Sequence, residues 1–273
     1  MKKLNFGCGT HIAEGWENID FVAFCPKVKL VNLLGGFPYP DNSFDVAYSS
    51  HVLEHFTKSD AFDILKEVYR ILRTDGIVRI VVPDLEGSCR EYLRVLEKPD
   101  TDKDKRKQYS WMIVELIDQM VRKQPAGEMG KMLAEIGKNK DQVLIDYVRL
   151  RQGSSWFTDG EPLRPFWQRL RGALSWGRIN VRLLSFYLHF VSYLLPKHIR
   201  KMAFVYAIGD QHLWMYDAYG LKLLLEDVGF CDCKICKFNE SSIPDFNRDC
   251  LDCTDTGVSY IKNSLYLEAR KKS

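Results

Sequence analysis

Three side chains suited to proton transfer or metal binding follow one another in a short segment. His51, Glu54 and His55 lie at spacings i, i+3 and i+4 in SSHVLEHF. If His51 opens a helix there, all three project from one face. Histidine gains and loses a proton near neutral pH, so we predict that His51 is a general base or a substrate contact. The alternatives for His51 are a divalent-metal ligand and a helix cap, and a structural hydrogen bond is slightly favoured for Glu54 and His55.

A glycine turn near the start of the sequence suits a nucleotide-like ligand. In NFGCGTHIA, Gly7 and Gly9 follow a short strand and allow a sharp turn that brings backbone N–H groups close to a ligand. Asp20 ends the next predicted strand, where a carboxylate can accept hydrogen bonds from ribose hydroxyls. Ala13 stands near the place where a dinucleotide-binding turn has its third glycine, which disfavours a nicotinamide cofactor. The alternative to a cofactor site is a tight turn beside a surface aspartate.

Four of the eight cysteines form two C-x2-C pairs. Their spacing resembles that of a zinc ribbon with a short intervening loop; the residues are Cys233, Cys236, Cys250 and Cys253. The favoured interpretation is buried and loop thiols, because small thiols are common in strands. Free thiols, together with a start that lacks the pattern of a secretion signal, predict a protein of the cytoplasm.

Alternating strand and helix signals predict an α/β fold, a sheet with helices on both faces. Strands are expected at residues 3–6, 16–20, 28–33, 44–50 and 77–84, with a helix at 60–72. After a long interruption, a helix at 217–228 and strands at 230–238 and 264–269 complete the pattern.

The interruption predicts a helical insertion, which begins at the charged segment 98–108 and divides the chain into 1–96, 97–207 and 208–273. Its apolar and basic stretch at 178–204 has an uninterrupted part of about 15 residues, against the ~20 that a membrane span needs. We expect a lid or acceptor-binding region there, and the alternative is a basic amphipathic element resting on anionic lipid.

The charged residues nearly balance, since 39 lysines and arginines face 36 aspartates and glutamates. This balance gives no global reason to expect a nucleic-acid partner. The hydrophobic fraction of 46% is sufficient for a substantial core.

Four segments together resemble a known family. They are LNFGCGTHIAEGWENID, FPYPDNSFDVAYSSHVLEHF, LKEVYRILRTDGIVRIVVPDLE and HLWMYDAYGLKLLLEDVGF. Their order and spacing are similar to those of predicted methyltransferases found among glycan biosynthesis genes, a type 11-like branch of the class I S-adenosylmethionine-dependent methyltransferases. The resemblance covers about residues 3–95 and 208–271. It implies a seven-stranded Rossmann-like sheet that binds S-adenosylmethionine at its carboxyl edge.

The resemblance also implies residue roles. The glycines shape the pocket beside the methionine part of the cofactor, and Asp20 binds the ribose. Asn32 stands where such proteins usually have an aspartate near the adenine, and an amide can still accept that hydrogen bond. The residues expected to contact the cofactor are Asn5, Phe6, Gly7, Gly9, Asp20, Phe21, Asn32, Leu33, Ser49, Ser50 and His51.

The same resemblance implies the reaction. S-adenosylmethionine donates a methyl group, S-adenosylhomocysteine is the product, and the expected acceptor is a hydroxyl of a saccharide, a lipid-linked glycan or a related polar metabolite. His51, Asp84 and His212 are the candidate catalytic residues. Some relatives bind a metal through such a helix and a later histidine, which His212 would supply. They have glutamate where this chain has His51, so a divalent metal is the alternative here and is not favoured. The alternative function is a non-catalytic module that binds a protein or a membrane.

Overall fold

The computed structural model describes residues 1–23, 25–123, 126–153, 157–158, 161–162, 211–254 and 256–272. These residues form two compact units. The core unit comprises Met1–Asp84, Trp214–Tyr260 and Ser264–Ser273, and the helical unit comprises Leu85–Leu213 and Ile261–Asn263. The predicted apolar stretch at 178–204, with its lid and membrane alternatives, lies outside the described residues.

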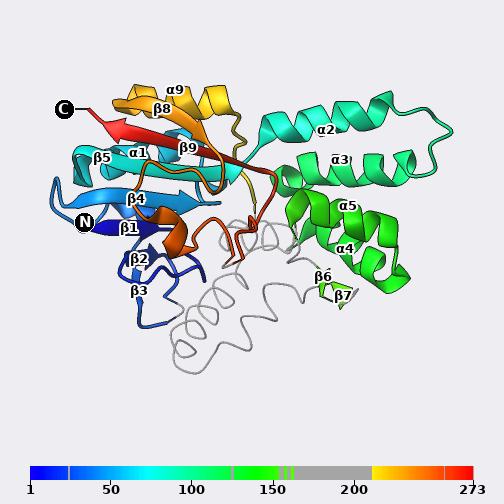
Figure 1. Cartoon of the computed structure of the whole chain (residues 1–273), viewed down its shortest axis with the longest axis horizontal. Coiled ribbons are helices and arrows are strands. Elements are labelled where there is room, and N and C mark those ends of the chain that lie inside the picture. Colours follow the sequence, from blue (N-terminus) through cyan, green and yellow to red (C-terminus); the bar gives the residue numbers. More distant parts are fainter. Residues whose placement is uncertain are drawn as a thin grey trace, which may run out of the picture. The chain divides into compact units, whose positions relative to one another are not determined.

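A mixed seven-stranded sheet forms the core unit (Figure 1), in the order β3-β2-β1-β4-β5-β9-β8. Neighbouring strands from β3 to β5 run parallel, whereas β9 is antiparallel to both β5 and β8. This is the seven-stranded Rossmann-like sheet that the sequence resemblance implies, so the predicted sheet is confirmed. The strands are β1 Lys3–Phe6, β2 Glu17–Asp20, β3 Val28–Leu30, β4 Phe44–Ser50, β5 Leu72–Pro83, β8 Phe230–Cys236 and β9 Ser264–Lys271.

Two helices cover one face of this sheet. The helices are α1, Lys58–Ile71, and α9, Ala218–Val228, and their apolar stripes pack on Ala47, Val78 and Leu267 of the central strands. Each helix has a side-chain N-cap, because Thr57 accepts a hydrogen bond from the backbone N–H of Asp60 and Asp217 accepts one from Gly220. These caps fix where the helices begin, and therefore fix the turns that precede them at the carboxyl edge of the sheet.

The predicted helices on both faces are found on one face only: within the described residues, the opposite face is covered by a segment that has no α-helix. Between β8 and β9 the chain includes the 3-10 helix η4, Phe246–Asp249, drawn in orange in Figure 1. Phe246 packs there against Tyr48 of β4. The guanidinium of Arg79, fully buried on β5, donates to the carboxylates of Asp252 and Glu268 at 2.7 Å each. This buried group ties the loop to the sheet.

The helical unit has its own core, in which Trp111, Met112 and Val148 are completely buried. Its α2 packs on α3 and belongs to this unit, so the unit begins at Leu85 rather than at the predicted residue 97. The elements are α2 Leu85–Glu97, α3 Lys105–Val121, α4 Gly127–Asn139, α5 Gln142–Gln152, β6 Phe157–Thr158 and β7 Glu161–Pro162.

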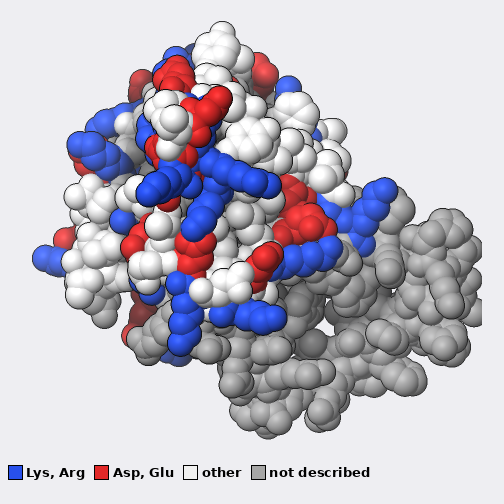
Figure 2. Space-filling view, turned by 90° about the vertical axis from the view of Figure 1, so that its right-hand side faces the viewer, with Lys and Arg blue, Asp and Glu red and all other residues white. Residues whose placement is uncertain are grey.

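Lysines and arginines are interspersed with aspartates and glutamates on the face shown in Figure 2. Within the described parts of the chain, none of the helices combines the length and apolar character that a membrane span requires.

Candidate functional site

The turn after β1 has two glycines in the left-handed region, with φ of +66° at Gly7 and +50° at Gly9. They differ in what surrounds them. A Cβ on Gly7 would collide with the side chain of Val52, whereas no described atom lies within 4 Å of a Cβ built on Gly9. Gly7 is therefore required for packing of the turn on the chain after β4, and Gly9 faces open space at the carboxyl edge.

Two buried amides hold the backbone of this loop. The side-chain amide of Asn5 donates to the carbonyl of His11 at 2.9 Å and to Oδ1 of Asn18 at 3.0 Å. Asn18 in turn accepts from the N–H of Ala13 and donates to its carbonyl. Because both amide hydrogens of Asn5 are used within the protein, this residue shapes the loop and its side chain has no donor left for a ligand.

The carboxylate of Asp20 accepts hydrogen bonds from two backbone N–H groups. Its Oδ2 accepts from the N–H of Gly9 at 2.8 Å, and its Oδ1 accepts from Val22 at 3.0 Å. Burial raises the pKa of Asp20, and the backbone donors of Val22, Gly9 and Phe21 oppose that effect. Each carboxylate oxygen can accept further hydrogen bonds, so a ligand hydroxyl can still be bound there.

The other predicted cofactor contacts fall into two groups. Phe6 and Leu33 are buried in the core below α1, so only their backbone is offered to a ligand. The side chain of Phe21 is exposed beside Asp20, and the exposed Asn32 accepts a hydrogen bond from Leu34 N, which begins the 3-10 helix η1, Leu33–Gly35. Asn32 thus has its Nδ2 available in addition to the second lone pair of Oδ1.

His51 follows the last residue of β4 with φ of +54°, a left-handed conformation in which histidine is enriched. Its backbone N–H donates to the carbonyl of Val81 on β5 at 2.9 Å. Nε2 of the ring lies 3.0 Å from Oγ of Ser264, and Nδ1 lies 3.3 Å from Oε1 of Glu54. The side chain is 23% exposed, so a substrate can approach it.

The predicted α-helix over residues 51–55 is wrong. The structure has a single 3-10 turn there, η2 at Leu53–His55, and Phe56 after it is extended. The reason is local: Thr57 caps α1, which begins only at Lys58. Contact between His51 and Glu54 is nevertheless present.

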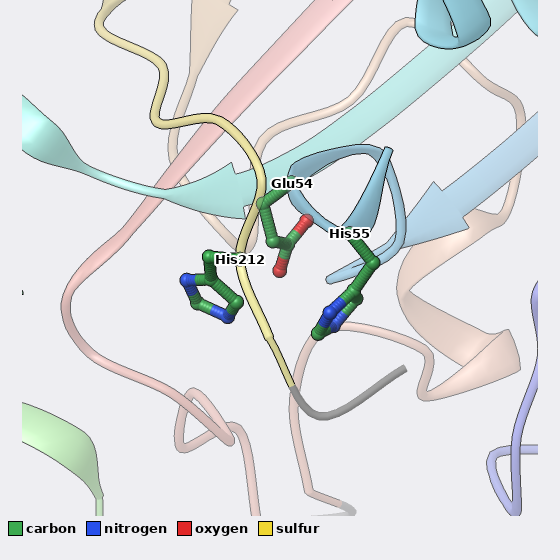
Figure 3. A group of neighbouring side chains, drawn as sticks. All are labelled: Glu54, His55 and His212. Carbon is green, nitrogen blue, oxygen red and sulfur yellow. The ribbon is translucent and has the colours of Figure 1, made fainter. Parts of the chain in front are cut away.

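Glu54 and His55 both come from η2, and Figure 3 draws them together with His212 of the helical unit. Glu54 is buried, and the N–H of Trp214 donates to its backbone carbonyl at 3.1 Å. His212 is buried and contacts α3. Its backbone N–H donates to the carbonyl of Gln119, and its Nε2 lies 2.9 Å from Nε2 of Gln119. Because His212 belongs to the helical unit, metal binding by His51, Glu54, His55 and His212 stays the alternative hypothesis that it was.

Asp84, Ser49 and Ser50 also lie at the carboxyl edge. Asp84 follows β5 and forms a backbone bridge with Tyr216, and the next residue, Asp217, is the N-cap of α9. Ser49 is buried, and its hydroxyl has no hydrogen-bond partner among the described residues. Such a hydroxyl needs a partner, and a bound ligand or water can supply one.

The cysteine pairs do not converge. Cys233 packs against the core below α1 and α9, and Cys236 is buried in the cluster on the opposite face, because three residues along a strand reverse the side-chain direction. No three thiols of the described residues lie within 4.8 Å of one another. Burial raises the pKa of the Cys8 thiol to about 12, so it stays protonated beside the glycine turn.

Two residues at this edge, His11 and Ser264, were missed by the sequence analysis. His11 lies edge-on to Tyr260 with ring centroids 4.8 Å apart, and desolvation followed by the charge of His51 lowers its pKa. Ser264 contacts His51 and pairs in register with Pro83. An antiparallel last strand must begin at the carboxyl edge of β5, so Ser264 could have been found from the topology.

Comparisons with known proteins agree with the fold. A family model described as a methyltransferase domain matches residues 23–80, which run from the chain before β3 into β5 and make up less than half of the chain. The match begins after the glycine turn and Asp20, so it does not bear on these residues.

Solved structures are similar at low identity. A complex of the Trm112 methyltransferase activator with a methyltransferase from Haloferax volcanii matches at 9% identity, with 100% of this chain and 83% of that chain covered and a TM-score of 0.38. A methyltransferase from Thermotoga maritima matches at 12%, covering 99% and 82%, with a TM-score of 0.39. One from Archaeoglobus fulgidus matches at 12%, covering 99% and 86%, with a TM-score of 0.37. All three scores lie below 0.5, so the fold assignment follows from the strand order of the sheet.

Proposed function

We propose that this chain is an S-adenosylmethionine-dependent methyltransferase that acts on a hydroxyl group. The observation that carries the proposal is the glycine turn joined to Asp20, in which Gly9 leaves open space directly beside a buried carboxylate at the carboxyl edge. Ligands of open α/β sheets bind at this edge.

The residues of the core unit fit S-adenosylmethionine. The turn at Gly9 would accommodate the methionine part, and Asp20, which accepts from the N–H of Gly9, would accept further hydrogen bonds from the ribose hydroxyls. Phe21 and the amide of Asn32 are available for the adenine. When bound, the cofactor would supply an electrophilic methyl group: the acceptor oxygen would form the new bond to the methyl carbon, and the electron pair of the broken carbon–sulfur bond would stay on the sulfur.

His51 provides the base that a hydroxyl acceptor requires. A neutral alcohol is a weak nucleophile, and removal of its proton during the attack contributes typically 10²–10⁴-fold to the rate. His51 is partly exposed at the carboxyl edge and held by contacts on both ring nitrogens. Asp84 lies at the end of the neighbouring strand, from which it would orient the acceptor.

The acceptor class follows from the sequence resemblance to methyltransferases of glycan biosynthesis. We propose a hydroxyl of a saccharide or a related polar metabolite. The catalytic residues proposed are those of the core unit, whereas any role of His212 and of the insertion depends on the helical unit.

A methyl-transfer assay with matched variants tests the function. The purified chain is incubated with S-adenosylmethionine and a panel of free and lipid-linked saccharides, and release of S-adenosylhomocysteine is measured. We expect acceptor-dependent release, and a loss of about 10²-fold in His51→Asn, which tolerates the left-handed backbone. No release with any acceptor, in a chain that binds the cofactor, would contradict methylation of a saccharide hydroxyl; equal rates in His51→Asn would contradict its role.

A further inference from the structure

Three separate elements meet at His51. The imidazole comes from the end of β4, the carboxylate of Glu54 from η2, and the hydroxyl of Ser264 from the first position of β9. Nε2 of His51 lies 3.0 Å from Ser264 Oγ, and Nδ1 lies 3.3 Å from Glu54 Oε1. All three belong to the core unit, although Ser264 is more than two hundred residues from His51 in sequence.

Charge decides which ring nitrogen of the neutral imidazole carries the proton. A carboxylate next to Nδ1 attracts an N–H at that nitrogen and repels a lone pair. Glu54 has a side chain only 1% exposed, so water screens its charge very little. Nδ1 is therefore protonated in the neutral ring, and the lone pair of His51 is on Nε2, which faces Ser264.

The hydroxyl of Ser264 has one proton, which it can donate to the lone pair on Nε2 of His51 at 3.0 Å. Its oxygen keeps two lone pairs, so it can accept a hydrogen bond from an acceptor hydroxyl at the same time. Ser264 can therefore receive one proton and pass on its own.

We propose that Ser264 relays a proton from the acceptor hydroxyl to His51, and that Glu54 is the positioning residue that keeps Nε2 free to receive it. This inference rests on the proposed function of the chain. Neither residue was assigned a catalytic part in the sequence analysis, where Glu54 appeared only as a structural or metal-binding candidate.

The relay conserves atoms and charge. As the acceptor oxygen forms its bond to the methyl carbon, its proton passes to Oγ of Ser264, and the proton of Ser264 passes to Nε2 of His51. Ser264 ends as a neutral hydroxyl. The positive charge lost at the sulfonium is carried by the imidazolium of His51, which faces the carboxylate of Glu54 at 3.3 Å.

Nuclear magnetic resonance tests the position of the proton without any turnover. Long-range proton–nitrogen spectra of the 15N-labelled chain, recorded at about pH 9 where histidine is neutral, distinguish a protonated ring nitrogen from an unprotonated one. The signals of His51 are identified by their absence in His51→Asn. We expect Nδ1 protonated in the wild type and a shift towards Nε2 protonation in Glu54→Gln. An unprotonated Nδ1 in the wild type, or an unchanged protonation of the His51 ring in Glu54→Gln, would overturn the role of Glu54.

Activity of serine variants tests the relay. We expect Ser264→Ala to retain the Nδ1 proton and cofactor affinity but to lose about tenfold in kcat, and Ser264→Thr, which restores a hydroxyl, to recover most of it. Ser43→Ala is the matched control, because Ser43 precedes β4 at the opposite edge of the sheet. A Ser264→Ala enzyme as fast as the control, or no recovery in Ser264→Thr, would overturn the relay.

The two readouts separate this inference from the proposed function. A chain with the expected proton on Nδ1 that releases no S-adenosylhomocysteine would contradict methyl transfer and leave the role of Glu54 intact. Normal methyl transfer with an unprotonated Nδ1 would contradict only the positioning role of Glu54 and would leave the proposed function intact.

Discussion

Gly9 offers the sharpest perturbation of the proposed cofactor site. Substitution by alanine adds one methyl group and keeps the backbone N–H that donates to Asp20 at 2.8 Å. Apart from its neighbours in the chain, no described atom lies within 4 Å of that methyl group, so no collision with the described residues is expected. A ligand bound in this space would collide with it.

Gly15→Ala is a matched control for the backbone. Gly15 also has positive φ, +77°, and also leaves a Cβ without a described atom within 4 Å. It lies just before β2, at the amino edge of the sheet, whereas Gly9 follows β1 at the carboxyl edge. A left-handed alanine costs about 1–2 kcal/mol, so both variants are expected to lose a similar free energy of unfolding.

The two variants should differ in cofactor binding. We expect Gly15→Ala to bind S-adenosylhomocysteine as the wild type does and Gly9→Ala to bind at least tenfold more weakly, which corresponds to about 1.4 kcal/mol. Isothermal titration calorimetry measures the affinities, and urea denaturation measures the free energies of unfolding. Equal affinity of both variants for S-adenosylhomocysteine would refute the placement of the cofactor at Gly9.

Three further substitutions test how the core unit is held together. In Asp20→Asn, an NH2 group faces one of the two backbone N–H donors, so the free energy of unfolding should fall by about 1–3 kcal/mol. S-adenosylhomocysteine should also raise the melting temperature of the variant less than that of the wild type. Equal melting temperatures of variant and wild type, with and without the ligand, would contradict this role of Asp20. Arg70 lowers the pKa of Glu67 through a side-chain hydrogen bond, so ionised Glu67 stabilises the fold above the usual carboxyl pKa of about 4.3, and this contribution is lost as the pH falls through the lowered pKa. Glu67→Gln should therefore lower the free energy of unfolding by about 1 kcal/mol at neutral pH. In acid titrations of stability, the difference between the variant and the wild type should narrow. Arg79→Met leaves two buried carboxylates unpaired and should cost about 3–5 kcal/mol in urea denaturation, and a loss below about 1 kcal/mol would contradict the importance of this buried group.

The sheet was predictable because its strands carry strong local patterns. FDVAYSS is apolar enough to be buried on both faces, and β4 has the predicted bounds. The helix over Asp217 was also correct, since a single N-cap marks its start. By contrast, β5 begins at Leu72, several residues before the apolar run from Ile77 that suggested it, because pairing with Phe44 of β4 extends it.

The surroundings of His51 could not be predicted in the same way. The spacing to Glu54 suggested an α-helix, but the left-handed backbone at His51 and the cap at Thr57 leave room for only a 3-10 turn. The contact with Ser264 depends on the pairing of the last strand with β5, which no local pattern encodes. Residue types identified the candidates, and topology determined their partners.

The roles of the buried amides were also beyond local sequence patterns. Asn5 was expected to contact the cofactor, yet its amide holds the loop through His11 and Asn18. An asparagine at the end of a strand has the same appearance in either role, because four donor and acceptor sites can serve a ligand or a backbone equally.

Calorimetric titration of the wild-type chain with S-adenosylhomocysteine tests the central claim most directly. We expect saturable binding of one equivalent, abolished or weakened at least tenfold in Gly9→Ala and retained in Gly15→Ala. Absence of binding by the folded wild-type chain would contradict the assignment of this carboxyl edge as a site for S-adenosylmethionine.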